Sequence, residues 1–307
     1  MSNVPQLNSH TTTVDGKKIH FLTCGKGEPL ILLHGYMTNA ATFPGLLEYL
    51  GEHYTVFAPD LPGFGTSDEL LGKPTLEDIA AHIGKWIIQE DFKNILLAGV
   101  SMGGSLSVYL ASLVDDRVKG YILLEPYLGR KTLKLPKGIM PMLRILTPFI
   151  DSPLTYGLGT KLWSSQKNME FLAHHIHVLV AGKNHDRPMA QKLAILTSGT
   201  YKSTWHTLQL LLDLDLSKQI NVSSKKAILL MSSKDEMLNY SKTLEGFKTI
   251  FPQLVAVPID IDEHYPTRPL TVRYLETHYP TLLQNVIKNF DQSWATTIKS
   301  FFTHLLE

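Results

Sequence analysis

With 307 residues, 44% of them hydrophobic and 19% charged, the chain can bury a large core and is not intrinsically disordered. Its 29 basic and 28 acidic side chains nearly cancel, which argues against a nucleic-acid partner, and its single cysteine, Cys24, excludes an internal disulfide. Because residues 1–13 lack the features of a signal peptide and no apolar run reaches the ~18 residues of a membrane span, we expect a soluble, cytoplasmic protein.

Short apolar segments bounded by glycine, proline or aspartate recur along the chain. The first two, residues 11–14 and 19–24, flank Asp15-Gly16, a pair typical of a tight hairpin turn. Six more segments follow, at residues 30–33, 54–58, 95–98, 121–124, 227–230 and 254–259. Most are continuous apolar runs, which is typical of parallel strands that are covered on both faces.

Helical patterns separate most of these strands. They cover residues 76–90, 105–113, 204–212, 241–251 and 285–306. The last of them carries its apolar side chains at helical spacing, which indicates a helix packed on the core. Alternation of strands and helices predicts an α/β fold with an open, mostly parallel sheet flanked by helices.

The alternation is interrupted once, after the sixth strand. No convincing strand occurs between residues 125 and 226, and the segment 139–150 (I-M-P-M-L-R-I-L-T-P-F-I) is rich in proline and large apolar residues. We therefore assign residues 127–197 to a helical cap or lid. The core then consists of residues 1–126 and 198–307.

The most informative motif is the sequence Gly99-Val100-Ser101-Met102-Gly103, which stands between the fifth strand and the following helix. A serine on a sharp strand-to-helix turn projects its Oγ above the sheet. The glycines two residues to either side leave room for the strained backbone of such a turn. The motif therefore predicts a nucleophilic serine at position 101.

Two further motifs follow strands in the same way. Leu32–Tyr36 (L-L-H-G-Y) closes the third strand, and Asp60–Ser67 (D-L-P-G-F-G-T-S) follows the fourth and is expected to form a structural turn. Together with the serine turn, these motifs resemble those of α/β-hydrolases of the serine esterase or lipase type. The resemblance covers about residues 10–126 and 200–290, and it implies a variable cap at the position of the insertion.

The resemblance also implies which residues assist the serine. The family order is serine, acid, histidine, and Asp235 after the seventh strand and His264 after the last strand occupy the corresponding places. We therefore predict Ser101 as nucleophile, His264 as general base and Asp235 as the acid that orients the imidazole. The backbone N–H groups of Tyr36 and Met102 are expected to form the oxyanion hole.

The sequence departs from the family beside the histidine, because Glu263 stands where a glycine is usual. This departure leaves a second candidate for the acid. Glu125, at the end of the sixth strand, occupies the alternative acid position of some similar enzymes, although we favour Asp235. His34 and Gly35 are expected to be structural, with the His34 ring bonded to the loop beneath the site.

A histidine cluster in the insertion suggests a metal site at first sight. It comprises His174, His175, His177 and His185. Neighbouring histidines point in different directions on a helix, and no second cluster at ligand spacing follows. We therefore expect neither a metal nor a cofactor.

These features predict a serine hydrolase, similar to carboxylesterases and lipases, that cleaves a carboxylic ester through an acyl-enzyme intermediate. The apolar insertion favours a small-molecule ester with a lipophilic acyl or alcohol group, and it also allows transient contact with a lipid surface. Similar proteins with the same triad cleave thioesters, lactones, amides or carbon–carbon bonds, or act as acyltransferases. Members with an aspartate nucleophile, the dehalogenases and epoxide hydrolases, are disfavoured by the serine. The alternative from another class is a non-catalytic ligand-binding protein of the same fold.

Overall fold

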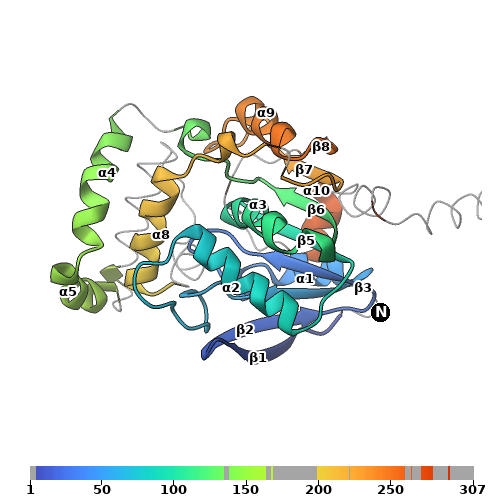
Figure 1. Cartoon of the computed structure of the whole chain (residues 1–307), viewed down its shortest axis with the longest axis horizontal. Coiled ribbons are helices and arrows are strands. Elements are labelled where there is room, and N and C mark those ends of the chain that lie inside the picture. Colours follow the sequence, from blue (N-terminus) through green and yellow to red (C-terminus); the bar gives the residue numbers. More distant parts are fainter. Residues whose placement is uncertain are drawn as a thin grey trace, which may run out of the picture.

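The computed structural model describes residues 5–134, 138–163, 167, 168, 199–220, 222–259, 264, 271–278 and 290. In this part of the chain, eight strands form a single sheet in the order β1-β2-β4-β3-β5-β6-β7-β8 (Figure 1). The strands are β1 (Asn8–Val14), β2 (Lys17–Cys24), β3 (Glu28–Leu33), β4 (Tyr54–Pro59), β5 (Ile95–Val100), β6 (Val118–Leu124), β7 (Ala227–Met231) and β8 (Leu254–Pro258).

The two N-terminal strands pair antiparallel, as the Asp15-Gly16 turn predicts, and β2 also pairs antiparallel with β4. Asp15 and Gly16 have φ angles of +48° and +74°, the two left-handed conformations that a tight hairpin turn requires. The strands from β4 across to β8 all run parallel. The predicted mostly parallel α/β sheet is therefore confirmed.

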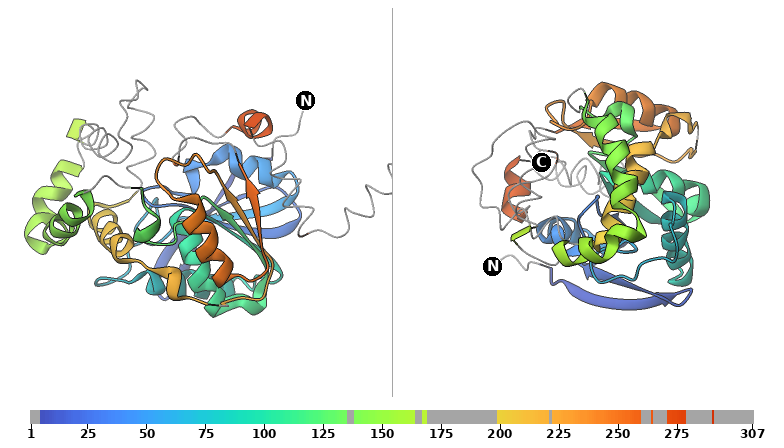
Figure 2. Two further views of the ribbon diagram at one scale, coloured as in Figure 1. Left: turned by 90° about the horizontal axis from the view of Figure 1, so that it is seen from above. Right: turned by 90° about the vertical axis from the view of Figure 1, so that its left-hand side faces the viewer.

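Helices cover both faces of this sheet, and Figure 2 shows them on its two sides. On one face lie α2 (Leu76–Gln89), α3 (Met102–Val114) and α9 (Tyr240–Ile250), and on the other lie α1 (Pro44–Gly51) and α10 (Val272–His278). Within β5, Leu97 packs into the first of these cores and Leu96 into the second, and neither is exposed. Coverage on both faces explains why the central strands are continuous apolar runs.

The sequence patterns did not predict every helix. They missed α1 and α10, whereas α2, α3, α8 (Tyr201–Asp213) and α9 agree with the predicted segments to within a few residues. Of the predicted helix 285–306, only Phe290 is among the described residues, and its side chain is buried in the core. Short 3₁₀ turns occur at η1 (Ala40–Thr42), η2 (Asp115–Arg117), η3 (Arg130–Thr132) and η4 (Leu216–Lys218).

Between β6 and β7 the described residues contain no further strand of this sheet. They form α4 (Ile139–Ile150) and α5 (Pro153–Trp163), which pack with α8 at one end of the molecule (Figure 1). The Tyr36 hydroxyl donates a 2.9 Å hydrogen bond to the carbonyl oxygen of Thr204, so α8 lies against the turn that follows β3. Residues 169–198, which make up much of the expected cap, lie outside the described residues.

A buried carboxylate joins α4 and α5 to the rest of the molecule. Asp151, between these two helices, accepts hydrogen bonds from Lys73 Nζ at 2.8 Å, Tyr156 Oη at 2.7 Å and His206 Nδ1 at 3.0 Å. Burial alone would raise the pKa of Asp151, but these three donors outweigh it and hold the pKa below its usual value. The donors come from the loop before α2, from α5 and from α8, so the carboxylate fixes three segments at once.

None of the helices that the structure describes is both long and apolar enough to cross a membrane.

Candidate active site

Ser101 occupies the sharp turn that joins β5 to α3. Its φ and ψ angles are +50° and −112°, a strained conformation for a residue with a side chain. The glycines on either side are required by close contacts. A Cβ on Gly99 would lie 2.4 Å from the carbonyl carbon of Gly103, and a Cβ on Gly103 would lie 2.3 Å from the carbonyl oxygen of Leu33. The motif therefore packs the turn against β3 at spacings that only glycine allows.

A chain of hydrogen bonds leads from Ser101 into the protein. Ser101 Oγ lies 2.9 Å from His264 Nε2, and His264 Nδ1 lies 2.7 Å from Asp235 Oδ2. All three side chains are buried. An ionised carboxylate can only accept, so the Nδ1 nitrogen carries a proton and the Nε2 nitrogen is left to accept from the serine hydroxyl. This is the arrangement in which an imidazole can act as a base toward the serine.

Asp235 is held as an anion by the groups around it. Its Oδ1 accepts hydrogen bonds from the backbone amides of Met237 at 2.7 Å and Leu238 at 2.8 Å. Burial alone would raise the pKa of Asp235, but its interactions with His264, Glu125 and the Leu238 amide outweigh burial and lower that pKa to about 2. The structure therefore joins His264 to Asp235, the acid that the sequence favours.

Glu125, the alternative acid, lies next to Asp235, but the hydrogen bond to His264 Nδ1 is made by Asp235. It follows β6 with a φ of +44°, is only 6% exposed, and its Oε1 accepts a 2.9 Å hydrogen bond from the backbone amide of Ser232. Burial, followed by the hydrogen bond and charge of Asp235, raises the pKa of Glu125 to about 10. Both candidate acids thus lie together behind the imidazole, and their pKa values are shifted in opposite directions.

One oxygen or nitrogen atom from each of Glu125, Asp235 and His264 lies within 4.8 Å of the others, close enough to surround a metal ion. Both ring nitrogens of His264 already make hydrogen bonds, to Ser101 and to Asp235. A metal ion bound here would have to displace one of those partners. Hydrogen bonding therefore explains better than a metal ion why these three side chains lie close together. The histidines at positions 174, 175, 177 and 185 lie outside the described residues.

The residues expected to form the oxyanion hole lie beside Ser101. A Cβ placed on Gly35 would lie 3.4 Å from the Ser101 Cβ, so the turn that contains Gly35 and Tyr36 lies against the turn that contains Ser101. Met102 is the first residue of α3, and the amides of the first turn of a helix have no acceptor within the helix. The expected oxyanion-hole residues therefore flank Ser101 on two sides.

His34 and Asp60 fix the loops beneath the site. The Nε2 atom of His34 accepts a 2.9 Å hydrogen bond from the Leu61 amide, and its Nδ1 donates to the Gly35 carbonyl at 2.8 Å. Burial lowers the pKa of His34, in agreement with a neutral ring that both donates and accepts. Asp60 accepts from the amides of Ala40 and Thr66 and from His20 Nδ1, at 2.8, 2.9 and 2.7 Å.

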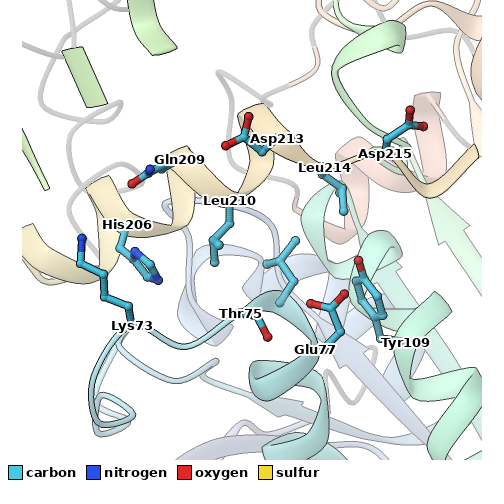
Figure 3. A pocket seen from close by; sticks show the side chains of 11 residues that line it. Lys73, Thr75, Glu77, Tyr109, His206, Gln209, Leu210, Asp213, Leu214 and Asp215 are labelled. Carbon is cyan, nitrogen blue, oxygen red and sulfur yellow. The ribbon is translucent and has the colours of Figure 1, made fainter. Parts of the chain in front are cut away.

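A cavity of about 350 Å³ lies between α8 and the start of α2. Figure 3 shows the residues that line it. Leu210 of α8 and Leu214, which directly follows α8, lie on one side, and Thr75, Glu77 and Tyr109 lie on the other. None of the residues of the hydrogen-bonded chain from Ser101 lines this cavity, so it is a separate hollow. Sequence reasoning missed both this cavity and the cluster around Asp151, because each unites segments that are far apart in the chain.

Comparison with known proteins identifies the family of this fold. A family described as "alpha/beta hydrolase fold" matches residues 28–262. The soluble epoxide hydrolase of Corynebacterium sp. (strain C12) is 28% identical over 120 residues, which are 39% of this chain and 42% of that protein. The pimeloyl-[acyl-carrier protein] methyl ester esterase of Pseudoalteromonas atlantica is 34% identical over 103 residues, which are 33% of this chain and 38% of that protein.

The two curated relatives are therefore matched over only about two fifths of their length. Among solved structures, a thermophilic esterase from Thermogutta terrifontis superimposes with a TM-score of 0.65 at 20% identity, covering 95% of this chain and 99% of that one. At this identity the superposition shows a shared fold. The family match extends over most of the chain and contains Ser101 and Asp235. The chain belongs to the alpha/beta hydrolase fold family.

Proposed function

We propose that this protein is a serine hydrolase that cleaves a carboxylic ester through an acyl-enzyme intermediate. The observation that carries the proposal is the buried chain of hydrogen bonds from Ser101 Oγ through both nitrogens of His264 to Asp235. A serine hydroxyl is a weak nucleophile until a base takes its proton, and this chain supplies the base and orients it.

In the first half of the reaction, Ser101 Oγ attacks the ester carbonyl carbon and its proton passes to His264 Nε2. The backbone N–H groups of Tyr36 and Met102 hold the resulting oxyanion, and the negative charge of Asp235 stabilises the imidazolium. His264 then gives the proton to the leaving alkoxide, so the alcohol departs and the acyl group remains on Ser101.

In the second half, water attacks the acyl carbon and gives a proton to His264. The imidazolium returns that proton to Ser101 Oγ as the bond to the acyl group breaks, which releases the carboxylic acid and restores the free enzyme. The strained turn at Ser101 supports both halves, because the hydroxyl is held in one place by packing against β3 before any substrate binds.

For the substrate, we propose an ester with a lipophilic acyl or alcohol group, enclosed by a cap formed by residues 127–197. The described helices of that segment support this assignment. Large apolar side chains of α4 and α5 remain exposed, among them Ile145, Phe149, Leu154 and Leu158. The matched relative from Pseudoalteromonas atlantica is an esterase by its description, whereas the relative from Corynebacterium is an epoxide hydrolase.

Hydrolysis of p-nitrophenyl esters over a series of acyl lengths tests the proposal. We expect the wild type to prefer the longer acyl chains and the Ser101→Ala variant to fall to background. Ser107→Ala is a matched control, because Ser107 is a buried serine on α3 that bonds only to a backbone carbonyl of its own helix. A short-chain preference would remove the lipophilic substrate, and a wild type without activity toward any ester would favour the ligand-binding alternative.

A further inference from the structure

Two carboxyl groups lie side by side behind His264, and only one of them binds the imidazole. The Glu125 side chain has a partner at one oxygen only, since Oε1 accepts from the Ser232 amide. The other oxygen, Oε2, is buried and has no donor facing it. A buried carboxylate oxygen without a donor is costly, so this atom needs an explanation.

The neighbouring Asp235 has the opposite character. Three N–H groups, from Met237, Leu238 and His264, point at its two oxygens, so it functions as an acceptor only. Two carboxylates in contact in a buried site do not both ionise, and the one with fewer donors keeps the proton. The proton therefore belongs on Glu125.

We propose that Glu125 is a positioning residue: it is held as a neutral carboxylic acid whose Oε2–H donates a hydrogen bond to Asp235, so the chain Ser101–His264–Asp235 has a fourth member. The proposal rests on the proposed function, because it gives Glu125 a part in the same reaction. It also explains why both acid positions can be filled in one protein: they hold one negative charge between them.

The charge on Glu125 matters to the imidazole. Among the described residues, a neutral Glu125 leaves Asp235 as the single negative charge behind the ring, whereas an ionised Glu125 would add a second one and stabilise the imidazolium before any substrate is bound. In the part of the chain that the structure describes, Lys134 is the charged side chain that also faces this group, and its Nζ donates to the backbone carbonyl of Asp235 at 2.6 Å. Burial and Asp235 raise the pKa of Glu125 more than Lys134 and the Ser232 amide lower it, and it reaches about 10.

The Glu125→Gln variant is the sharpest test, because a glutamine has the shape and the hydrogen bonds of a neutral glutamic acid. Its amide can donate to Asp235 while its oxygen accepts from Ser232. We expect its kcat on a p-nitrophenyl ester to stay within about threefold of wild type near neutral pH, whereas Glu125→Ala should lower kcat roughly 10- to 100-fold with little change in KM. The unchanged KM is expected because Glu125 lies behind Asp235 and does not touch the substrate.

Infrared spectroscopy tests the protonation directly and does not depend on activity. The wild type near neutral pH should show the stretching band of a protonated carboxyl group, which should be absent from Glu125→Gln and should disappear from the wild type in alkaline solution. Absence of the band from the wild type would overturn the proposal, even if the alanine variant does not fold. A loss of kcat in Glu125→Gln as large as in Glu125→Ala would also overturn it.

These measurements separate the two proposals. A wild type that shows the band but hydrolyses no ester and accepts no fluorophosphonate probe would contradict the proposed function and with it the positioning role, and would leave the acid–carboxylate pair intact. A wild type that is active but lacks the band would contradict the neutral Glu125 alone.

Discussion

His264 Nδ1 lies 2.7 Å from Asp235 Oδ2, on the opposite edge of the ring from Ser101. This contact decides which nitrogen of the imidazole carries the proton, because the carboxylate accepts only. The other oxygen of Asp235 is fixed by two backbone amides, so the acid cannot turn away from the ring without losing them. Asp235 thereby sets both the tautomer and the orientation of the base.

The Asp235→Asn variant should therefore fold and lose most of its activity. Its side-chain oxygen can still accept from the two amides, but its NH₂ group would face His264 Nδ1 and place the ring proton on the wrong nitrogen. We expect kcat to fall roughly 10³- to 10⁴-fold. Steady-state kinetics on a p-nitrophenyl ester measures this, with Asp213→Asn, an exposed aspartate, as the control. A larger loss in Glu125→Gln than in Asp235→Asn would assign the orienting role to Glu125.

Gly103→Ala should strongly destabilise the fold, whereas Gly157→Ala should not. A Cβ at position 103 would lie 2.3 Å from the backbone oxygen of Leu33, and neither backbone can move without disturbing the sheet. We expect a loss of more than about 3 kcal/mol in the free energy of unfolding. Gly157 lies in α5, and a Cβ at this position would meet nothing within 4 Å, so alanine there should stabilise the helix by up to about 1 kcal/mol. Urea unfolding compares the two, and equal effects would contradict the close contact.

Glu125 should make the wild type less stable in alkaline solution. Folding raises the pKa of Glu125 from its ordinary value of 4.5 to about 10, so between these values the folded chain holds a proton that the unfolded chain releases. This contribution to stability is complete below about 4.5 and is lost as the pH rises through about 10. Glu125→Gln cannot titrate, so its free energy of unfolding should fall less between about pH 6 and about pH 9. Parallel profiles for the two proteins would contradict a raised pKa.

Asp151→Ala should destabilise the attachment of α4 and α5. The substitution leaves Lys73, Tyr156 and the buried His206 without their common acceptor, and we expect a loss of about 3–5 kcal/mol. Arg144→Ala is the control, because its ion pair with Asp213 is half exposed and should contribute about 0–1 kcal/mol. Urea unfolding and limited proteolysis of residues 139–163 measure the effect. Equal losses of unfolding free energy in the two variants would contradict a stabilising role for the hydrogen bonds to Asp151.

Local patterns were sufficient to predict most of the sheet and the position of the serine. Leu96 and Leu97 point to opposite faces of the sheet, and both are fully buried. A continuous apolar run of this kind indicates a parallel strand without any knowledge of its neighbours in the sheet. Helix α1, by contrast, has only eight residues, too few to show a helical period clearly. Its proline at the first position was the available signal.

The parts that sequence reasoning missed depend on contacts between distant segments. Glu125 was recognised as a candidate acid, but its contact with Asp235 joins positions 110 residues apart. The cluster around Asp151 joins three segments in the same way, and the only trace of it in the sequence is a lone acid within an apolar stretch. A single sequence reports what each segment prefers and contains no direct record of which side chains meet.

Labelling with a fluorophosphonate probe, followed by mass spectrometry of the peptides, tests the central claim most directly. The account predicts one phosphonyl adduct on Ser101 of the wild type and of Ser107→Ala, no adduct on Ser101→Ala, and labelling of His264→Ala slower by roughly 10³-fold or more. An adduct on another residue, or equal labelling of the wild type and Ser101→Ala, would contradict the assignment of Ser101 as the nucleophile.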